Sequence, residues 1–347
     1  MKIKFPCPKA LVCVVCFVLL CALAIVGLAC SSKEVPTVVV YTALDEMYSR
    51  PILDAFERDT GIHVEPVYDT EAAKTTGLVT RLIQERNRPR ADVFWNNEVA
   101  QTIVLKNKEV LAQYRSPSAD AIPAKFKDAD GYWAAFAARG RVLIYNTGLV
   151  ETPPTSILDF TKEEWRGKAA IAKPLFGTTA THGAALFVLW GDEKAKAFFK
   201  ALNANDVAVL AGNATVRDLV AQGEYAVGLT DTDDANGAIE DGLPAQWLFP
   251  DQGADGIGTL VIPNTVALIK DGPNSEGGKR LIDYLLSPGV EAQLARMRSI
   301  QIPLNPAVEA PEGVPKLEDI KTMQVDFSDV AAKMGGSARY FQEEFLR

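Results

Sequence analysis

The segment 230–234 holds the highest density of potential ligand atoms, because Asp231, Asp233 and Asp234 place three carboxylates beside Thr232. Carboxylate oxygens suit a hard cation, and they could equally pair with an ammonium group on an organic solute. The spacing does not match an EF-hand calcium loop, since the glycine falls at the seventh position from Asp231 and no glutamate stands at the twelfth. We predict ligand contact by these four residues, with Asp231 and Asp233 as metal ligands. Helix capping within a solvated acidic loop is the alternative.

Two further segments offer binding groups of opposite kinds. Residues 44–46 follow a predicted strand and include two carboxylates, which are candidate metal ligands, although Asp45 could instead cap the next helix. Residues 177–179 open a predicted helix, where free N–H groups and the helix dipole favour an anion. The predicted contact residues are Leu44, Asp45, Glu46, Gly177, Thr178 and Thr179.

Catalytic motifs are missing from the sequence. It contains no G-x-S-x-G, H-E-x-x-H, P-loop or G-x-G-x-x-G. Its two histidines, His63 and His182, are interpreted as structural, and all five cysteines lie within the first thirty residues. Thiolate catalysis and cysteine-ligated zinc are therefore excluded from the rest of the chain. A metal-dependent hydrolase remains only a minor alternative to a binding protein, and no cofactor is predicted.

The beginning of the chain has the layout of an export signal. Lys2, Lys4 and Lys9 precede an uninterrupted apolar run over residues 10–29, and the run ends at Ala29-Cys30. The segment around Cys30 resembles the lipobox of bacterial lipoproteins, which predicts a signal peptide over residues 1–29 and lipidation of Cys30. A membrane anchor or simple secretion are the alternatives. All three place the folded part outside the cytoplasm, as a periplasmic or cell-surface protein.

The remaining chain is acidic and long enough for two α/β lobes. Removal of residues 1–29, which hold three lysines and no acidic residue, changes the net charge from −8 to −11 and argues against a nucleic-acid partner. Strands and helices alternate, which favours a largely parallel sheet with helices on both faces. Strands are predicted over 37–42, 63–67, 92–95, 141–145, 169–172, 207–210, 225–230, 260–262 and 266–269. Helices are predicted over 47–60, 76–87, 181–202, 214–222, 276–286, 290–297 and 327–346.

Five segments in order carry a resemblance to a known family: 40–46, 55–61, 91–96, 138–146 and 262–270. They resemble solute-binding proteins of bacterial ABC importers, and most of all the branch that binds ferric iron. The resemblance implies a two-lobed type II periplasmic-binding-protein clamshell that performs no chemistry and delivers its solute to a permease and an ATPase. It implies a tether over 30–36, a first lobe over 37–138 plus 263–347, and a second lobe over 139–262. Hinges are predicted at 137–141 and 262–264.

The resemblance also implies further site residues. Residues 96–98 follow a strand where some relatives carry a metal-binding glutamate, although these residues could cap a helix. The arginines at the lobe crossing could bind a synergistic carbonate or phosphate, or form a salt bridge between the lobes, and Tyr145 could offer a phenolate or belong to the core. The residues implied are Asn96, Asn97, Glu98, Arg139, Arg141 and Tyr145.

The identity of the solute divides two ways. The overall resemblance favours ferric iron as the transported ligand, alone or together with a synergistic anion. However, ferric-binding relatives place two adjacent tyrosines where this chain has residues 231–234, and no adjacent tyrosine pair occurs in the sequence. That departure favours an organic solute such as an aminoalkyl phosphonate, a polyamine or a thiamine-like cation. A sensory domain with the same fold is the alternative to a transport receptor.

Overall fold

The computed structural model describes residues 36–69 and 75–347. Residues 37–347 form one compact unit, and none of the described helices is long and apolar enough to cross a bilayer. The predicted signal peptide, Cys30 and most of the tether lie outside the described residues. The lobe boundaries at 138/139 and 262/263 stay predictions.

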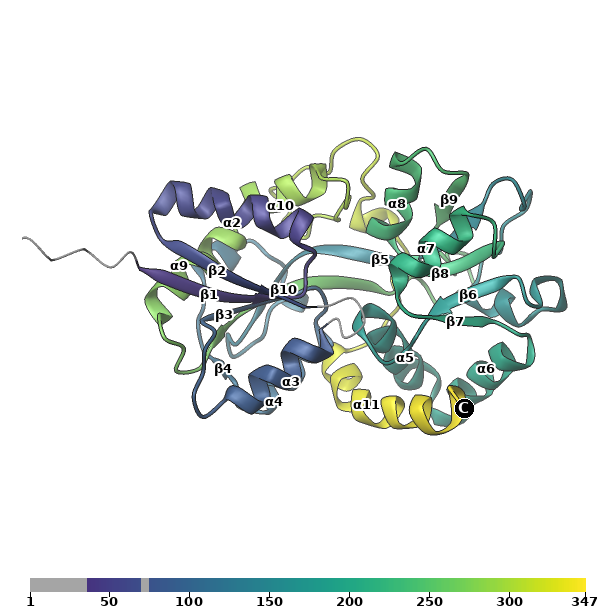
Figure 1. Cartoon of the computed structure of the whole chain (residues 1–347), viewed down its shortest axis with the longest axis horizontal. Helices are drawn as coiled ribbons and strands as arrows, with labels where there is room; N and C mark the ends of the chain where they lie inside the picture. The colour runs from purple at the N-terminus through teal and green to yellow at the C-terminus, as the bar shows by residue number, and fades with distance from the viewer. Residues whose placement is uncertain (1–35, 70–74) are drawn as a thin grey trace, which may run out of the picture. The chain divides into compact units, whose positions relative to one another are not determined.

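The first group of strands lies at the N-terminal end of this unit (Figure 1). β1 (Thr37–Thr42) pairs in parallel with β2 (His63–Tyr68) and β3 (Val93–Asn96), and β10 (Val261–Ile269) pairs antiparallel with β3 and with the short β4 (Leu111–Ala112). The apolar run of β1 is continuous, and because successive side chains point to opposite faces, both faces of the strand are apolar and need cover. Val38 and Val40 pack into the core that includes residues of α2 (Glu46–Thr60), α9 (Ser275–Leu285) and α10 (Pro288–Arg296). Tyr41 packs with residues of α3 (Thr76–Glu85) and α4 (Ala100–Asn107).

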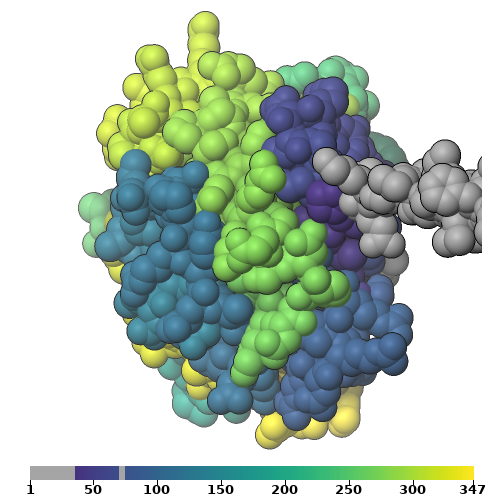
Figure 2. Space-filling model, turned by 90° about the vertical axis from the view of Figure 1, so that its left-hand side faces the viewer, coloured from purple at the N-terminus to yellow at the C-terminus, as the bar shows by residue number. Residues whose placement is uncertain are grey.

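The end of this first group is visible in Figure 2, where the green segment that contains α9 lies between the purple N-terminal elements and the blue segment around residues 110–130. Short 3₁₀ turns η2 (Pro117–Ala119) and η3 (Ala124–Phe126) belong to that blue segment. The carboxyl ends of β1 and β3 point away from this end, toward the second group of strands. The loops that follow β1 and β3 are thereby placed where the two groups meet.

β5 (Ala134–Asn146) joins the two groups, because its 13 residues take part in both. Its first half pairs antiparallel with β10, and from Arg141 onward it pairs antiparallel with β8 (Val227–Asp231) and β9 (Ala245–Leu248). β8 continues in parallel to β6 (Ala169–Ala172), which pairs in parallel with β7 (Ala208–Leu210). The sheet order is β2-β1-β3-β10-β5-β8-β6-β7. The sheet is therefore mixed, with parallel pairs on the outside and antiparallel pairs where the chain crosses.

Helices surround the second group of strands. They are α5 (Gly177–Trp190), α6 (Asp192–Ala204), α7 (Asn213–Ala221), α8 (Thr232–Glu240) and α11 (Phe327–Tyr340), with shorter turns η4 (Ile157–Thr161), η5 (Glu163–Trp165) and the π-helical η7 (Phe341–Phe345). The turn η6 (Leu317–Asp319) instead packs through Leu317 against the core of the first group. Buried aromatic rings hold the C-terminal segment in place. Phe341 packs against Phe199 of α6 with ring centroids 4.7 Å apart, and against Phe187 of α5 at 5.9 Å.

Four predicted elements differ in extent from those of the structure. The predicted helix 181–202 is two helices, α5 and α6, because Gly191 between them has φ of +74°, a conformation that ends a helix and that glycine adopts at little cost. The two predicted strands 260–262 and 266–269 form one strand, since a register shift between Pro263 and Asn264 accommodates the proline, which has no N–H to donate. The predicted helix 327–346 leaves α-helical geometry at Phe341.

A buried polar cluster lies beside the crossing strands. Ala137 of β5 has φ of +44°, and its N–H donates to the Glu291 carboxylate at 2.6 Å. The same carboxylate accepts from the N–H of Leu304 at 2.7 Å and of Asn305 at 2.8 Å. The Asn264 side-chain amide donates to the Ala137 carbonyl at 2.9 Å. These bonds hold the strained backbone of β5 at the predicted hinge.

Candidate functional site

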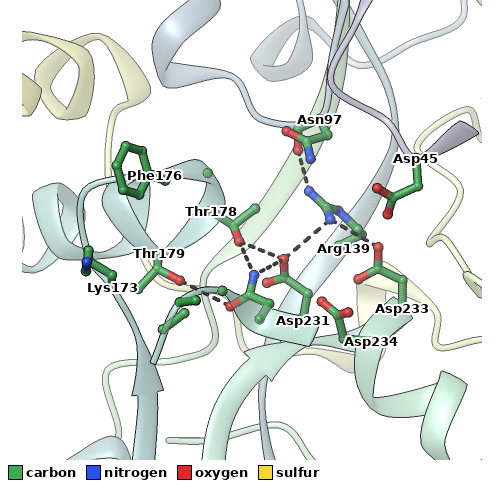
Figure 3. A pocket seen from close by; sticks show the side chains of 15 residues that line it. Asp45, Asn97, Arg139, Lys173, Phe176, Thr178, Thr179, Asp231, Asp233 and Asp234 are labelled. Atoms are coloured by element: carbon green, nitrogen blue, oxygen red, sulfur yellow. Dashed lines mark hydrogen bonds and ion pairs between the residues drawn. The ribbon is translucent and has the colours of Figure 1, made fainter. Parts of the chain in front are cut away.

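A cleft of about 430 Å³, partly open to solvent, lies where strand ends of both groups meet. Its walls come from the loops after β1 and β3, from β5, and from the loops after β6, β7 and β8 (Figure 3). This position agrees with the general rule that open α/β sheets bind ligands beyond the carboxyl ends of their strands. The lining residues are Asp45, Asn97, Arg139, Ala172, Lys173, Phe176, Gly177, Thr178, Thr179, Ala211, Gly212, Asn213, Asp231, Asp233 and Asp234.

Asp231, Asp233 and Asp234 gather on one wall of this cleft, which we call the acidic wall. Asp231 ends β8, and Asp233 and Asp234 belong to the first turn of α8. Each of the three offers a ligand oxygen, and these atoms lie within 4.8 Å of one another. Asp231 is only 1% exposed and makes no side-chain capping bond to α8, and Asp233 is 5% exposed. A solvated capping loop therefore does not describe these two residues.

Two arginines of β5 neutralise much of that acidity. Arg141 is fully buried, and its guanidinium lies 2.6 Å from Asp231 Oδ1. Arg139 lies two residues earlier on the same strand and contacts Asp233 Oδ2 at 3.1 Å and Asp231 Oδ2 at 3.4 Å. Burial alone would raise the pKa of Asp231, but the two guanidinium groups and the Thr178 hydroxyl outweigh burial and lower the pKa. Asp231 is thus held as a carboxylate inside the wall.

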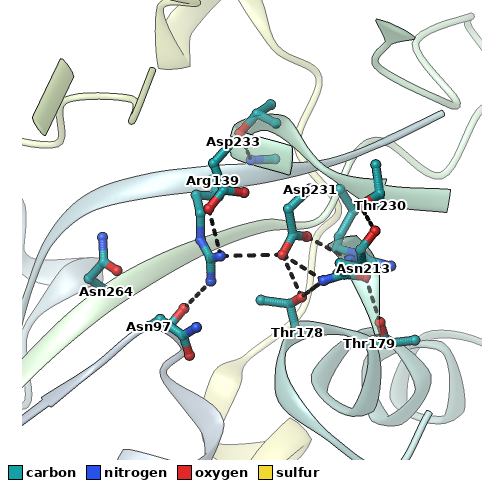
Figure 4. Close-up of polar contacts among 12 residues, drawn as sticks. Asn97, Arg139, Thr178, Thr179, Asn213, Thr230, Asp231, Asp233 and Asn264 are labelled. Atoms are coloured by element: carbon teal, nitrogen blue, oxygen red, sulfur yellow. Dashed lines mark hydrogen bonds and ion pairs between the residues drawn. The ribbon is translucent and has the colours of Figure 1, made fainter. Parts of the chain in front are cut away.

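The polar contacts of Asp231 extend to two helix starts (Figure 4). Thr178, in the first turn of α5, donates from its hydroxyl to Asp231 Oδ2 at 2.6 Å. The Asn213 amide, at the first residue of α7, donates to the same oxygen at 3.0 Å, and its carbonyl oxygen accepts from Arg141 at 3.1 Å. Thr179 donates to Asn213 Oδ1 at 3.2 Å. The wall beside Asp231 is therefore built from two helix N-termini, which contacts with the Asp231 carboxylate hold in one orientation.

The wall formed by the two helix N-termini suits an anion. The first N–H groups of a helix have no acceptor within the helix, and the helix dipole adds positive potential there. Residues 177–179 of α5 and 211–213 before and at the start of α7 all line the cleft, and Lys173 adds a cationic side chain on this side. The cleft therefore has a donor wall, defined by Lys173 and these two segments, facing an acceptor wall of Asp45, Asp233 and Asp234.

Several predicted contact residues lie outside the cleft. Leu44 is buried in the core beneath α2, and Glu46 is exposed and pairs with Arg50 at 3.4 Å. Tyr145 follows Arg141 by four residues on β5, which places it about 13 Å farther along the strand at about 3.3 Å per residue. There it packs against the core of the second group of strands. Thr232 is buried and accepts the N–H of Gly140 at 3.3 Å.

Glu98 and Asn96 also serve the fold rather than the cleft. The Glu98 carboxylate accepts the N–H groups of Ala100 at 2.8 Å and Gln101 at 2.9 Å, so it caps α4, and burial raises its pKa. Asn96 donates to Glu98 Oε1 at 3.1 Å. Asn97, between them, lines the cleft instead. Arg141 supports the wall from beneath without lining the cleft, so neither it nor Glu98 is placed to touch a solute.

Sequence reasoning missed Ala172, Lys173, Ala211, Gly212 and Asn213. The signal was available, because Lys173 directly follows the predicted strand 169–172 and residues 211–213 directly follow the predicted strand 207–210. The strand-end rule, applied to every predicted strand, finds both segments.

Comparison with known proteins places this cleft in a family context. A family model described as bacterial extracellular solute-binding protein matches residues 52–322. A Salmonella typhi protein named "Putative 2-aminoethylphosphonate-binding periplasmic protein" is 26% identical over 91% of this chain and 94% of its own length. The major ferric iron-binding protein of Neisseria meningitidis serogroup B is 23% identical over 90% of this chain and 94% of its own. The crystal structure of iron-bound HitA from Pseudomonas aeruginosa superposes with a TM-score of 0.80 at 21% identity, over 88% of this chain and 99% of that one. The structural likeness shows the two-lobed α/β fold of periplasmic binding proteins.

Proposed function

Because the chain belongs to the family of bacterial extracellular solute-binding proteins, we propose that it is the solute receptor of an ABC importer. It captures its solute in the cleft and delivers it to a permease and an ATPase, from a periplasmic or cell-surface position held by a lipid on Cys30. The observation that supports this most is a cleft whose walls come from strand ends on both sides of the crossing strands. A solute that touches both walls stabilises the closed form by its differential affinity for that form.

Ferric iron is the proposed solute, bound by the carboxylates of Asp231, Asp233 and Asp234. Their ligand oxygens lie within 4.8 Å of one another, and a hard cation prefers such oxygens. The meningococcal relative is named for ferric iron. No tyrosine is among the residues that line the cleft. The nearby Tyr48 has a pKa raised to about 12 by burial and then by Asp233, Asp234 and Asp45, so its phenol stays neutral at physiological pH. We therefore expect carboxylate rather than phenolate coordination.

An aminoalkyl phosphonate is the second candidate, and the two facing walls favour it. A phosphonate would lie against the donor wall, where helix N-termini and Lys173 face the cleft. The ammonium group of the same solute would lie against Asp45, Asp233 and Asp234. The Salmonella relative is named for this class of solute.

One titration distinguishes the two candidates. Protein without residues 1–29 is titrated calorimetrically with ferric citrate and with 2-aminoethylphosphonate, and the iron complex is examined for visible absorption. We expect one of the two solutes to bind, and Asp233→Asn to weaken that binding by about 2 kcal/mol or more, the scale of a lost charged contact. Asp241→Asn, an exposed acid after α8, is the matched control and should bind like the wild type.

The receptor proposal has clear contrary outcomes. Binding of neither solute, or equal affinity of Asp233→Asn and Asp241→Asn, would remove this cleft from consideration as their binding site. A strong visible charge-transfer band in the ferric complex would show phenolate coordination and contradict the carboxylate site.

A further inference from the structure

The Arg139 guanidinium is a positive charge that already lies against the acidic residues of the cleft. Its guanidinium contacts Asp233 Oδ2 at 3.1 Å and Asp231 Oδ2 at 3.4 Å, so it lies against two of the three carboxylates of the acidic wall (Figures 3 and 4). The same guanidinium donates to the Asn97 carbonyl at 2.6 Å. Asn97 follows β3, Asp231 ends β8, and Asp233 lies in the first turn of α8. The Arg139 side chain therefore links the strand ends of both groups.

The burial of the Arg139 guanidinium lowers stability wherever its charge and its N–H donors are not compensated. Arg139 is 4% exposed while it lines the cleft, and its Nε–H has no hydrogen-bond partner among the described residues. A guanidinium has five N–H donors, and an unsatisfied buried donor lowers stability. Without a cation beside them, the buried carboxylates of Asp231 and Asp233 would lack part of their counter-charge, which is also costly. The guanidinium therefore contributes its charge.

Charge counting shows what that contribution is. The three aspartates carry three negative charges, and Arg139 and Arg141 carry two positive charges within ion-pair distance of them. Arg141 is fully buried beneath the wall and outside the cleft, whereas Arg139 is in the cleft. Repulsion between a cation and a guanidinium grows in proportion to the charge of the cation and is strong at low local dielectric. Arg139 therefore opposes a trivalent ion about three times as strongly as an ammonium group.

We propose that Arg139 is the residue that sets the charge of the solute, as an internal counter-ion that a multivalent cation must displace from Asp231 and Asp233. This inference rests on the proposed binding role of the acidic wall. Displacement also releases the Asn97 carbonyl, so the binding of a multivalent cation is coupled to the link between the two groups of strands. Arg139 is a specificity-determining residue in this proposal rather than an anion ligand.

The test compares Arg139→Met, which removes the charge at similar length, with Arg139→Lys, which keeps it. The probe is Tb³⁺, a hard trivalent ion followed by its luminescence, added to protein without residues 1–29. We expect Arg139→Met to bind Tb³⁺ about tenfold or more tightly than the wild type, and Arg139→Lys to bind within about threefold of it. Arg166→Met, which removes an exposed charge outside the cleft, controls for net charge and should resemble the wild type.

The outcomes separate this inference from the receptor proposal. Equal or weaker binding of Tb³⁺ by Arg139→Met would overturn it, as would an equal gain in Arg166→Met. If Arg139→Met does not fold by circular dichroism, Arg139→Gln, whose amide can still donate to the Asn97 carbonyl, replaces it with the same expectation. If Asp233→Asn, made in the otherwise wild-type chain, changes neither Tb³⁺ binding nor solute binding, the proposed site itself is contradicted, whatever the Arg139 variants show.

Discussion

Replacing Arg141 by methionine should destabilise the fold strongly, because it leaves Asp231 charged and buried. Loss of one partner of a buried ion pair costs about 3–5 kcal/mol. Asp231 would retain the Thr178 hydroxyl at 2.6 Å, the Asn213 amide at 3.0 Å and Arg139 at 3.4 Å. These remaining contacts place the expected loss at the lower end, about 3 kcal/mol.

The assay is urea unfolding of protein without residues 1–29, followed by circular dichroism and tryptophan fluorescence. Coincident transitions by the two probes justify a free energy from the midpoint. Arg166→Met is the matched control, since Arg166 makes an exposed ion pair with Glu163, and it should leave the midpoint nearly unchanged.

A double-mutant cycle tests the reason for the loss as well as its size. Asp231→Leu alone leaves Arg141 buried without its closest partner, while Arg141→Met with Asp231→Leu removes both charges. The double variant should be more stable than the sum of the single effects implies, by about 2 kcal/mol or more. A loss below about 1 kcal/mol in Arg141→Met, or additive effects in the cycle, would refute the view that this pair holds the wall together.

Two further variants test the interior. Glu291→Gln should lower the free energy of unfolding by about 1–3 kcal/mol. The Glu291 carboxylate accepts the backbone N–H groups of Ala137, Leu304 and Asn305, and the amide nitrogen of glutamine would face at least one of them as a second donor. An unchanged urea midpoint would contradict this. Burial lowers the pKa of His182 to about 3 in the folded protein, whereas the unfolded value is about 6.5, so the unfolded state binds the extra proton and stability falls as pH drops below about 6.5. Between pH 7.5 and 5 the wild type should lose about 2 kcal/mol more than His182→Gln, and parallel pH profiles of the two proteins would show that His182 is not buried in neutral form.

Local patterns predicted the elements well where one physical rule acts alone. The β-branched run of β1 and the spacing of Ile52, Leu53 and Phe56 on α2 identify a strand and a helix because burial of one face needs only neighbouring residues. The strand-end rule then located Asp45, Asn97, Thr178 and Asp231 on the cleft. Predictions failed where two short elements meet, as at Gly191 and Pro263, because periodicity continues across such a point while the backbone turns or shifts.

Within a loop, the sequence does not determine which side chain faces the cleft. Glu98 offers the better ligand atoms, but the free N–H groups at the start of α4 compete for its carboxylate, and the Thr181 hydroxyl adds a bond to it at 2.7 Å. Asn97 faces the cleft as a result. The competition is decided by tertiary packing, since Thr181 belongs to α5, 83 residues away along the chain.

The electrostatic character of the acidic segment depends on strand register in the same way. Residues 231–234 taken alone carry three negative charges, a pattern that predicts a site for a strongly charged cation. Antiparallel pairing places Arg141 opposite Asp231 and brings Arg139 onto Asp233, 94 residues away in sequence. A shift of one residue between β5 and β8 would change which groups face each other across the pair. The charge that the cleft presents to a solute is therefore a property of this register, and Arg139 is the part of it that a single substitution can change without removing the Arg141–Asp231 pair beneath the wall.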